Sequence, residues 1–150
     1  MTEFKTILCP VDLSDPSSSA VPVALAMART HGARLLLVHV VDDAFPFPDA
    51  FAWVSPGEDY HRAMRKAALE GMEKILAAHG EHGVTVERIV LQGRPHREVL
   101  ALAQERGVDL IVLSTRGRSG LDWALIGSQA EKIIRGAACP VLTIKPKPAP

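Results

Sequence analysis

Short apolar runs alternate with helical segments along the whole chain. The runs lie at Thr6–Val11, Ala33–Val41, Val84–Gln92, Val108–Thr115 and Pro140–Pro146. The second run is almost continuously apolar, as expected of a strand covered on both faces. Strands that alternate with helices indicate βαβ units with right-handed crossovers. We therefore predict one α/β domain over residues 1–150, an open five-stranded parallel sheet with helices on both faces, as in Rossmann-like folds.

Prolines and glycines set the expected helix boundaries. One helix is predicted over Glu58–His79, and another begins at Pro95 and stops at Gly107. Pro22 lacks the N–H that an interior helical residue donates, so the first helix either begins near residues 18–19 or is kinked. We favour the later start, which puts Pro22 in the first turn. The tail at residues 145–150 is predicted to be loose.

The composition excludes several classes of protein. Apolar residues make up 47% of the 150 residues, and 17 basic residues balance 17 acidic ones. This argues against a disordered chain and against a nucleic-acid binder, whose charge should be clearly positive. The opening MTEFKTILCPVD lacks the features of a secretory signal. We expect a cytoplasmic protein with no membrane partner, in which Cys9 and Cys139 are buried thiols.

Three predicted strands end in polar residues. Asp12 follows the first strand, His39 and Asp42 end the second, and a glycine-rich stretch, STRGRSGLDWALIGS, follows the fourth. Open parallel sheets bind ligands beyond the carboxyl ends of their strands. If the first and fourth strands are neighbours, Asp12 and the glycine-rich stretch face the same crevice.

The glycine-rich stretch, residues 114–128, has the features of an anion site. Its glycines permit close backbone approach to a ligand. Ser128 and Glu131 fit a capping box with Ser128 as N-cap. A helix that begins there would direct its free N–H groups and its positive dipole end at the stretch. The pattern is neither a P-loop nor a GxGxxG loop, and a purely capping role for Ser128 stays open.

Two further features of the stretch and its surroundings each allow more than one interpretation. Arg116 and Arg118 are suited to phosphate oxygens, but they are equally well explained as solvated loop charges. The apolar, proline-rich segment 44–57 is compatible with a lid, a partner-binding surface or a packed loop.

The residues of the stretch also carry a family resemblance. Glycine, two residues, glycine, nine residues, glycine and then serine or threonine is the signature of ATP-binding universal stress proteins. Here its positions are Ser114, Gly117, Gly127 and Ser128. The segments ILCPVDLS, LLLVHVV, GRPHREV and ACPVLTIKP extend the resemblance over the chain. The sequence thus resembles a single-domain, UspA-like universal stress protein of the adenine nucleotide α-hydrolase-like group, with serine in place of the first glycine.

The resemblance implies ATP as the ligand, with Mg²⁺ near Asp12 through the bound nucleotide. It implies that Pro10, Val11 and Val40 shape the adenine pocket. It also implies that Gly117, Gly127 and Ser128 hold ribose and phosphates. With the two arginines and Gln129 added, the predicted nucleotide-binding residues are Pro10, Val11, Asp12, Val40, Ser114, Arg116, Gly117, Arg118, Gly127, Ser128 and Gln129.

The predicted function is a cytosolic universal stress protein in which ATP is a regulatory ligand in stress response or signalling. No catalytic residue is predicted, because GxSxG, HExxH and triad spacings do not occur; at most, hydrolysis would be slow. A nucleotide-free interaction or chaperone-like module and a weak ATPase are the alternatives, the former favoured by Ser114. The edge strand at residues 140–145 predicts a homodimer, because a bare β-branched edge invites pairing.

Overall fold

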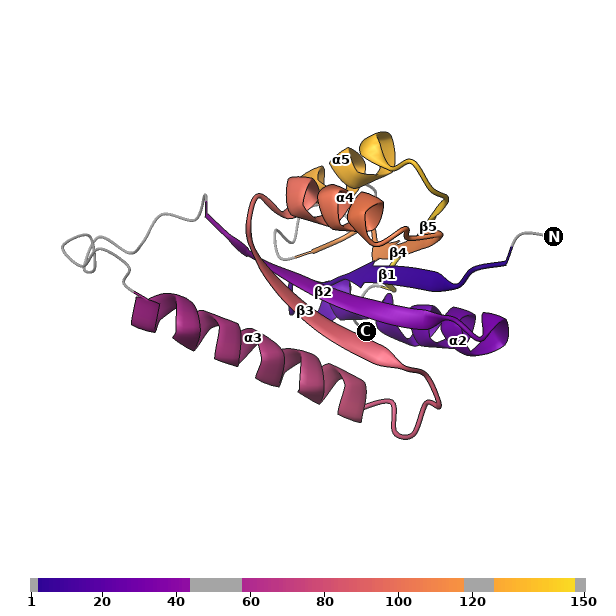
Figure 1. Ribbon diagram of the computed structural model, residues 1–150, viewed down its shortest axis with the longest axis horizontal. Coiled ribbons are helices and arrows are strands. Elements are labelled where there is room, and N and C mark those ends of the chain that lie inside the picture. The colour runs from indigo at the N-terminus through magenta and orange to yellow at the C-terminus, as the bar shows by residue number, and fades with distance from the viewer. Residues whose placement is uncertain (1–2, 44–57, 118–125, 148–150) are drawn as a thin grey trace.

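The computed structural model describes residues 3–43, 58–117 and 126–147, and it contains one parallel sheet. The strand order is β3-β2-β1-β4-β5, and every neighbouring pair is parallel (Figure 1). The strands are β1 (Thr6–Pro10), β2 (Arg34–Asp42), β3 (Val86–Gly93), β4 (Leu110–Ser114) and β5 (Val141–Ile144). The open five-stranded parallel sheet predicted from the alternation of runs is confirmed.

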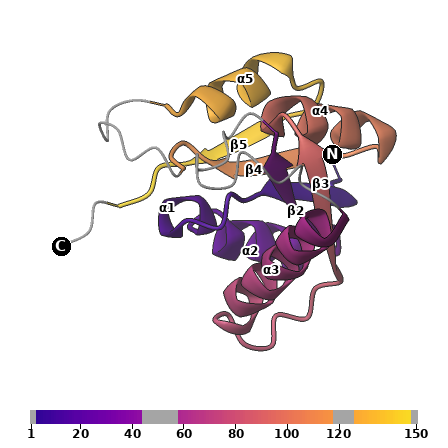
Figure 2. The same ribbon diagram turned by 90° about the vertical axis from the view of Figure 1, so that its left-hand side faces the viewer.

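The helices cover both faces of this sheet. They are α1 (Asp15–Ser18), α2 (Val21–His31), α3 (Glu58–Ala77), α4 (Pro95–Glu105) and α5 (Ser128–Gly136). Helices α1, α2 and α3 lie on one face, and α4 and α5 lie on the other (Figures 1 and 2). Within the described residues, no helix is long and apolar enough to cross a membrane.

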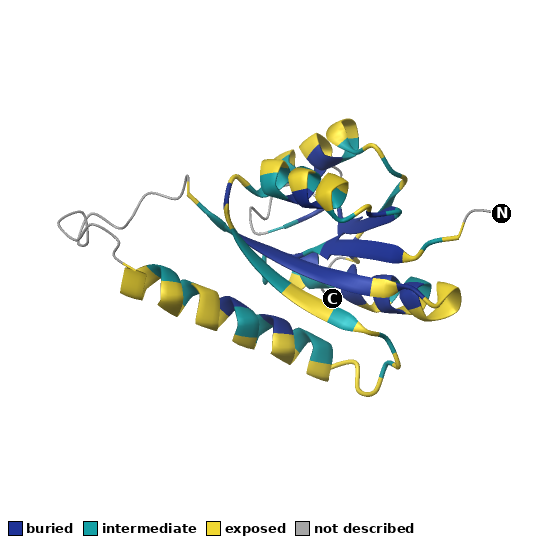
Figure 3. Cartoon of the chain, in the orientation of Figure 1, coloured by how far each residue is buried: buried dark blue, intermediate teal, exposed yellow. Residues whose placement is uncertain are grey.

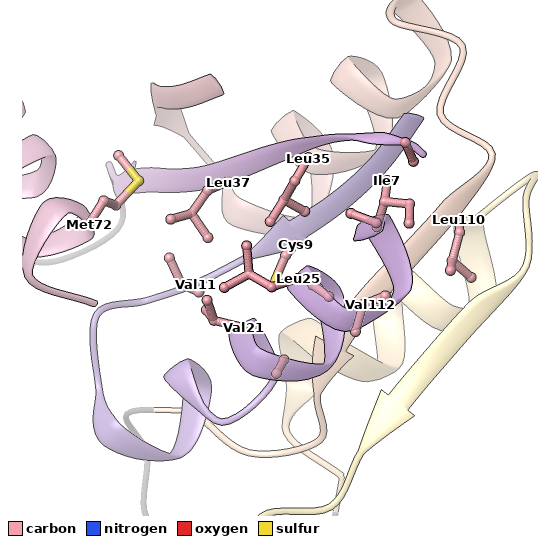
Figure 4. Close-up of a cluster of buried hydrophobic side chains, with 14 residues drawn as sticks. Ile7, Cys9, Val11, Val21, Leu25, Leu35, Leu37, Met72, Leu110 and Val112 are labelled. Carbon is pink, nitrogen blue, oxygen red and sulfur yellow. The ribbon is translucent and has the colours of Figure 1, made fainter. Parts of the chain in front are cut away.

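Alternate residues of the central strands belong to two separate hydrophobic cores, one on each face of the sheet. Ile7 and Cys9 of β1 pack towards α2 and α3, in the cluster drawn in Figure 4. Leu8, between them in sequence, belongs to the other cluster with Val99 of α4 and Ile133 of α5. The central strands are therefore buried on both faces, whereas edge strand β3 is partly exposed (Figure 3).

Pro22 is accommodated by a break between two helices. Helix α1 ends at Ser18, and α2 begins at Val21, so Pro22 occupies its first turn, where no intrahelical N–H is required. The structure thus confirms the later start but adds the separate helix α1. The side chain of Ser14 caps α1 by accepting a hydrogen bond from the Ser17 amide at 3.3 Å.

The two cysteines differ in burial. Cys9 is completely buried in β1, and this burial raises the pKa of its thiol to about 12. Cys139 is only half-buried, so the prediction of two buried thiols is wrong for this residue: the bend before β5 leaves it partly open to solvent. Desolvation raises its pKa as well.

Burial of Cys9 predicts an alkaline loss of stability. The folded-state pKa lies above the unfolded value, so the contribution is complete below about pH 9 and is lost as the pH rises towards 12. The free energy of unfolding should fall by up to about 1.4 kcal/mol per pH unit in this range through this thiol. Urea unfolding at pH 8 to 11 measures it. Cys9→Ala should show a shallower decline, and identical slopes in the two proteins would contradict the assignment.

Candidate functional site

A cavity of about 770 Å³ opens at the carboxyl ends of β1, β2 and β4. Strand β1 lies between β2 and β4, and the chain proceeds outward from it in one direction to β3 and in the other to β5. Connections diverge at such a switch point, and the divergence leaves a crevice in open α/β sheets. The predicted juxtaposition of Asp12 with the glycine-rich stretch is therefore confirmed, because β1 and β4 are neighbours.

The cavity brings together nearly all of the predicted site residues. Ten of them contribute to its wall: Pro10, Val11, Asp12, Val40, Ser114, Arg116, Gly117, Gly127, Ser128 and Gln129. Arg118, with the rest of residues 118–125 and the segment 44–57, lies outside the described residues. The ten wall residues come from segments that are far apart in sequence, and the topology of the sheet brings these segments together.

Asp12 is fixed by the turn that follows β1. Its Oδ1 accepts hydrogen bonds from the Ser14 amide at 2.9 Å and from the Ser14 hydroxyl at 2.5 Å. Its own amide donates to Ser17 Oγ at 2.9 Å. Leu13, between Asp12 and Ser14, has a φ of 68°, a left-handed conformation that is costly for a branched side chain. The carboxylate thus has a defined position at the cavity wall.

Gly117 lies directly against this carboxylate. A Cβ on Gly117 would stand 2.4 Å from Asp12 Oδ2, well inside any tolerated contact. The glycine is therefore required for space, and it lets the backbone after β4 approach the end of β1. The other signature glycine in the described residues, Gly127, is different: its φ is −60°, and a Cβ there would lie 3.4 Å from the Thr115 carbonyl oxygen.

Ser128 is the first residue of α5 and does not cap it, so the predicted capping box is wrong. The N-cap is Gly127, whose carbonyl oxygen accepts the Glu131 amide at 3.0 Å, and no side chain caps the helix. The Gly127 amide donates to the Thr115 carbonyl oxygen at 2.7 Å, and this bond sets the register one residue earlier. The interpretation of Ser128 as only a helix cap is excluded, and its exposed side chain borders the cavity.

The end of β4 contributes a hydroxyl and a guanidinium. Ser114 is buried, and its Oγ accepts the Arg116 amide at 3.3 Å, so the hydroxyl is turned back onto its own loop. Arg116 is only 7% exposed, which excludes its interpretation as a solvated loop charge. It places positive charge in the wall near the N-terminus of α5.

The opposite end of the cavity includes residues that the sequence analysis did not select. Asp43, beyond β2, accepts a hydrogen bond from Gln92 Nε2 of β3 at 3.0 Å. Tyr60, His61 and Met64 of α3 also line this end. Asp43 and Gln92 could have been selected from the sequence, because both are polar residues at the ends of predicted strands. No sequence pattern indicates the residues of α3, because the position of this helix beside the cavity depends on tertiary packing.

Two histidines near the cavity have structural partners. His39 is buried, and its Nδ1 lies 2.9 Å from the Val11 carbonyl oxygen, which can only accept, so Nδ1 carries the proton. The ring of His39 is thus hydrogen-bonded to the backbone just beyond β1, although His39 also borders the cavity. His96, at the start of α4, contacts Gln129 of α5 through its amide and its ring.

Metal-ligating side chains are sparse here. In residues 3–43, 58–117 and 126–147, no group of three or more histidine, cysteine, aspartate or glutamate side chains could hold a metal ion. Three carboxylates line the cavity, those of Asp12, Asp42 and Asp43, and Asp12 is the one that the sequence predicted to lie near a nucleotide-bound Mg²⁺.

The fold and the cavity together define a doubly wound α/β protein with a ligand crevice at its switch point. A family model matches residues 3–145 and describes the Universal stress protein family. The chain therefore belongs to the universal stress protein family, as its signature predicted. One relative, the universal stress protein in the QAH/OAS sulfhydrylase 3′ region of Thermus aquaticus, is 41% identical over 144 residues, which are 95% of this chain and 99% of that protein.

Solved structures show the same fold. The protein MJ0577 of Methanocaldococcus jannaschii matches with a TM-score of 0.83 and 27% identity, covering 99% of this chain and all of that chain. The universal stress protein from Archaeoglobus fulgidus in complex with dAMP matches with a TM-score of 0.65 and 21% identity, covering 97% of this chain and all of that chain. The latter likeness is one of fold alone.

The contact between Gly117 and Asp12 can be tested by a double-mutant cycle. Gly117→Ala should cost about 1–3 kcal/mol of unfolding free energy, because the new Cβ must displace a carboxylate that Ser14 holds. In an Asp12→Ala background the same change should cost much less. Gly127→Ala, whose Cβ would lie 3.4 Å from the Thr115 carbonyl oxygen, is the matched control, and its cost should be the same in both backgrounds. An equal cost of Gly117→Ala in both backgrounds, measured by urea unfolding, would rule out the contact.

Proposed function

We propose that this protein is a cytoplasmic universal stress protein that binds ATP in the cavity as a regulatory ligand. The observation that carries the proposal is the anion-favouring end of the cavity. There the buried side chain of Arg116 and the first turn of α5 occur together. Each of these features favours phosphate groups, and they come from two separate segments of chain.

The remaining wall is compatible with the rest of the nucleotide. Pro10, Val11 and Val40 offer an apolar surface for a flat base. Asp12 and Ser128 supply oxygen atoms suited to ribose hydroxyls or to a phosphate-bound Mg²⁺. A cavity of about 770 Å³ falls in the size range of ligand sites in general. The Archaeoglobus complex supports the proposal only through the fold, by holding an adenine nucleotide, dAMP.

Ser114 does not stand against the proposal. A serine in place of the first signature glycine raised the alternative of a closed site and a nucleotide-free interaction module. Its hydroxyl is engaged with the Arg116 amide, and the cavity persists around it. The serine therefore costs the site little room, and an adenine nucleotide as ligand is favoured over the interaction module.

Addition of Mg-ATP should raise the melting temperature of the nucleotide-stripped protein. A ligand at about 100 times its Kd adds about 2.7 kcal/mol, or roughly 5–10 °C in a domain of this size. Gly127→Val should abolish the shift by placing a branched side chain in the wall. Ala138→Val, on an exposed residue outside the cavity wall, is the matched control and should keep it.

The other outcomes identify the alternatives. Absence of both a shift and copurifying nucleotide would favour the nucleotide-free interaction module. Release of ADP that stops in Asp12→Asn would indicate a weak ATPase. A shift that Gly127→Val leaves intact would place nucleotide elsewhere and contradict the proposed site.

We further propose a homodimer formed through β5. This strand is at the edge of the sheet, and Val141, Leu142 and Ile144 on it are only half-buried. The Pro140 and Ile144 carbonyl oxygens face β4, because they accept the Ile111 and Thr115 amides at 3.0 and 2.9 Å. By alternation, the polar backbone groups of residues 141 and 143 point to the open edge, where a second copy can pair with them.

Light scattering at micromolar concentration should give twice the mass of the chain. Thr143→Pro removes an amide that points to the open edge, and it should convert the dimer to a monomer with little loss of fold. Thr143→Val keeps the amide and should remain dimeric. A monomeric wild-type protein, or a dimeric Thr143→Pro variant, would contradict pairing through β5.

A further inference from the structure

One side chain joins the first turns of α4 and α5 beside the cavity. Gln129 Oε1 of α5 lies 3.0 Å from the His96 backbone nitrogen and 2.9 Å from His96 Nδ1. A backbone amide only donates, so the glutamine atom facing it is its carbonyl oxygen, and Nδ1 of His96 must be the second donor. Both side chains are half-buried, where water competes less for these bonds.

This contact replaces a cap that α4 lacks. The N-cap residue, Arg94, makes no side-chain cap hydrogen bond, and Pro95 at the first helical position has no N–H. The next free amide is that of His96, which is the position a capping side chain normally satisfies. Gln129 supplies the acceptor from a different helix, so capping of α4 and placement of α5 are one interaction.

Helix α5 is held against α4 at its other end as well. Ile133 of α5 packs in the same cluster as Val99 of α4. Near the end of α5, a Cβ on Gly136 would stand 2.6 Å from Leu100 Cδ1, which shows how closely the two helices approach. With both ends fixed, the N-terminus of α5 cannot turn from the cavity unless the bonds between Gln129 and His96 break.

We propose that Gln129 is a positioning residue for the anionic part of the ligand. It acts by holding the N-terminus of α5 in place through its two hydrogen bonds to His96, which we call the Gln129–His96 clasp. The inference rests on the proposed nucleotide site and deepens it. An uncharged amide joins the helices and leaves the positive field of the α5 terminus intact. A carboxylate at the same place would accept the same two hydrogen bonds and oppose that field.

Calorimetric titration with ATP and with adenosine tests this role, because adenosine has no phosphate for α5 to hold. Gln129→Ala should bind ATP about tenfold more weakly, and adenosine within about twofold of wild type. Gln129→Glu should recover the melting temperature that Gln129→Ala loses, yet bind ATP at least about tenfold more weakly than wild type. Gln104→Ala, an exposed glutamine near the end of α4, is the matched control and should change neither affinity.

Substitution of His96 distinguishes a positioning role of Gln129 from direct contact between Gln129 and the ligand. Gln129 is part of the cavity wall, whereas His96 is not. His96→Ala removes one of the two donors and should weaken ATP binding a few-fold. Combined with Gln129→Ala it should add nothing further. An unchanged ATP affinity in His96→Ala would overturn the proposal, and so would an equal loss of ATP and adenosine in Gln129→Ala.

A wild-type protein that binds neither ATP nor adenosine would instead refute the proposed function, and the ligand role of Gln129 with it. Amide hydrogen exchange in the ligand-free protein would then still test whether the hydrogen bond from the His96 amide to Gln129 forms. The His96 amide should exchange faster in Gln129→Ala and return to the wild-type rate in Gln129→Glu. Unchanged exchange in Gln129→Ala would show that the clasp does not form.

Discussion

The pairing of β1 with β4 is the constraint on which the site depends. Asp109, just before β4, accepts the Lys5 and Thr6 amides through Oδ2 at 2.8 and 2.9 Å, and its own amide donates to the Thr6 carbonyl oxygen at 2.9 Å. These bonds lock the beginning of β1 to β4. The paired register extends to Leu8 and Ile111, and β1 continues to Pro10 and β4 to Ser114 before the chain enters separate loops. The two strands are thus held together at their starts, and the crevice opens at their carboxyl ends, where the connections diverge.

Around this crevice, short polar side chains hold backbone in conformations that regular structure would not supply. Asp12 organises the turn into α1 through Ser14, Ser114 holds the Arg116 amide, and Gln129 caps α4 from α5. Each side chain satisfies a backbone donor at a strand or helix terminus, where partners within the element end. The wall of the cavity is therefore defined by hydrogen bonds as well as by packing.

Most of the fold and much of the site follow from patterns with a single physical cause. Apolar runs predicted the five strands, and prolines and glycines fixed several helix starts and stops. The capping box failed because its motif is local: whether Gly127 or Ser128 is the N-cap depends on the bond from the Gly127 amide to Thr115, twelve residues away. The hydrogen bonds between Gln129 and His96, and the contribution of α3 to the cavity wall, join segments even further apart in sequence. No sequence pattern predicts such contacts. Register within one residue and contacts between helices are decided by tertiary packing.

The glycine signature combines positions with different physical requirements, and this explains how the chain departs from it. Gly117 cannot be replaced without displacement of the Asp12 carboxylate, because any Cβ at this position would collide with it. Position 114 has no such neighbour in its way, and a serine there satisfies an amide two residues later. Gly127 has an ordinary φ, and a Cβ there would lie 3.4 Å from the Thr115 carbonyl oxygen, so glycine is required less strictly than at position 117. Substitution is therefore tolerated first where a side chain can be turned onto its own loop. It is excluded where backbone meets a fixed carboxylate.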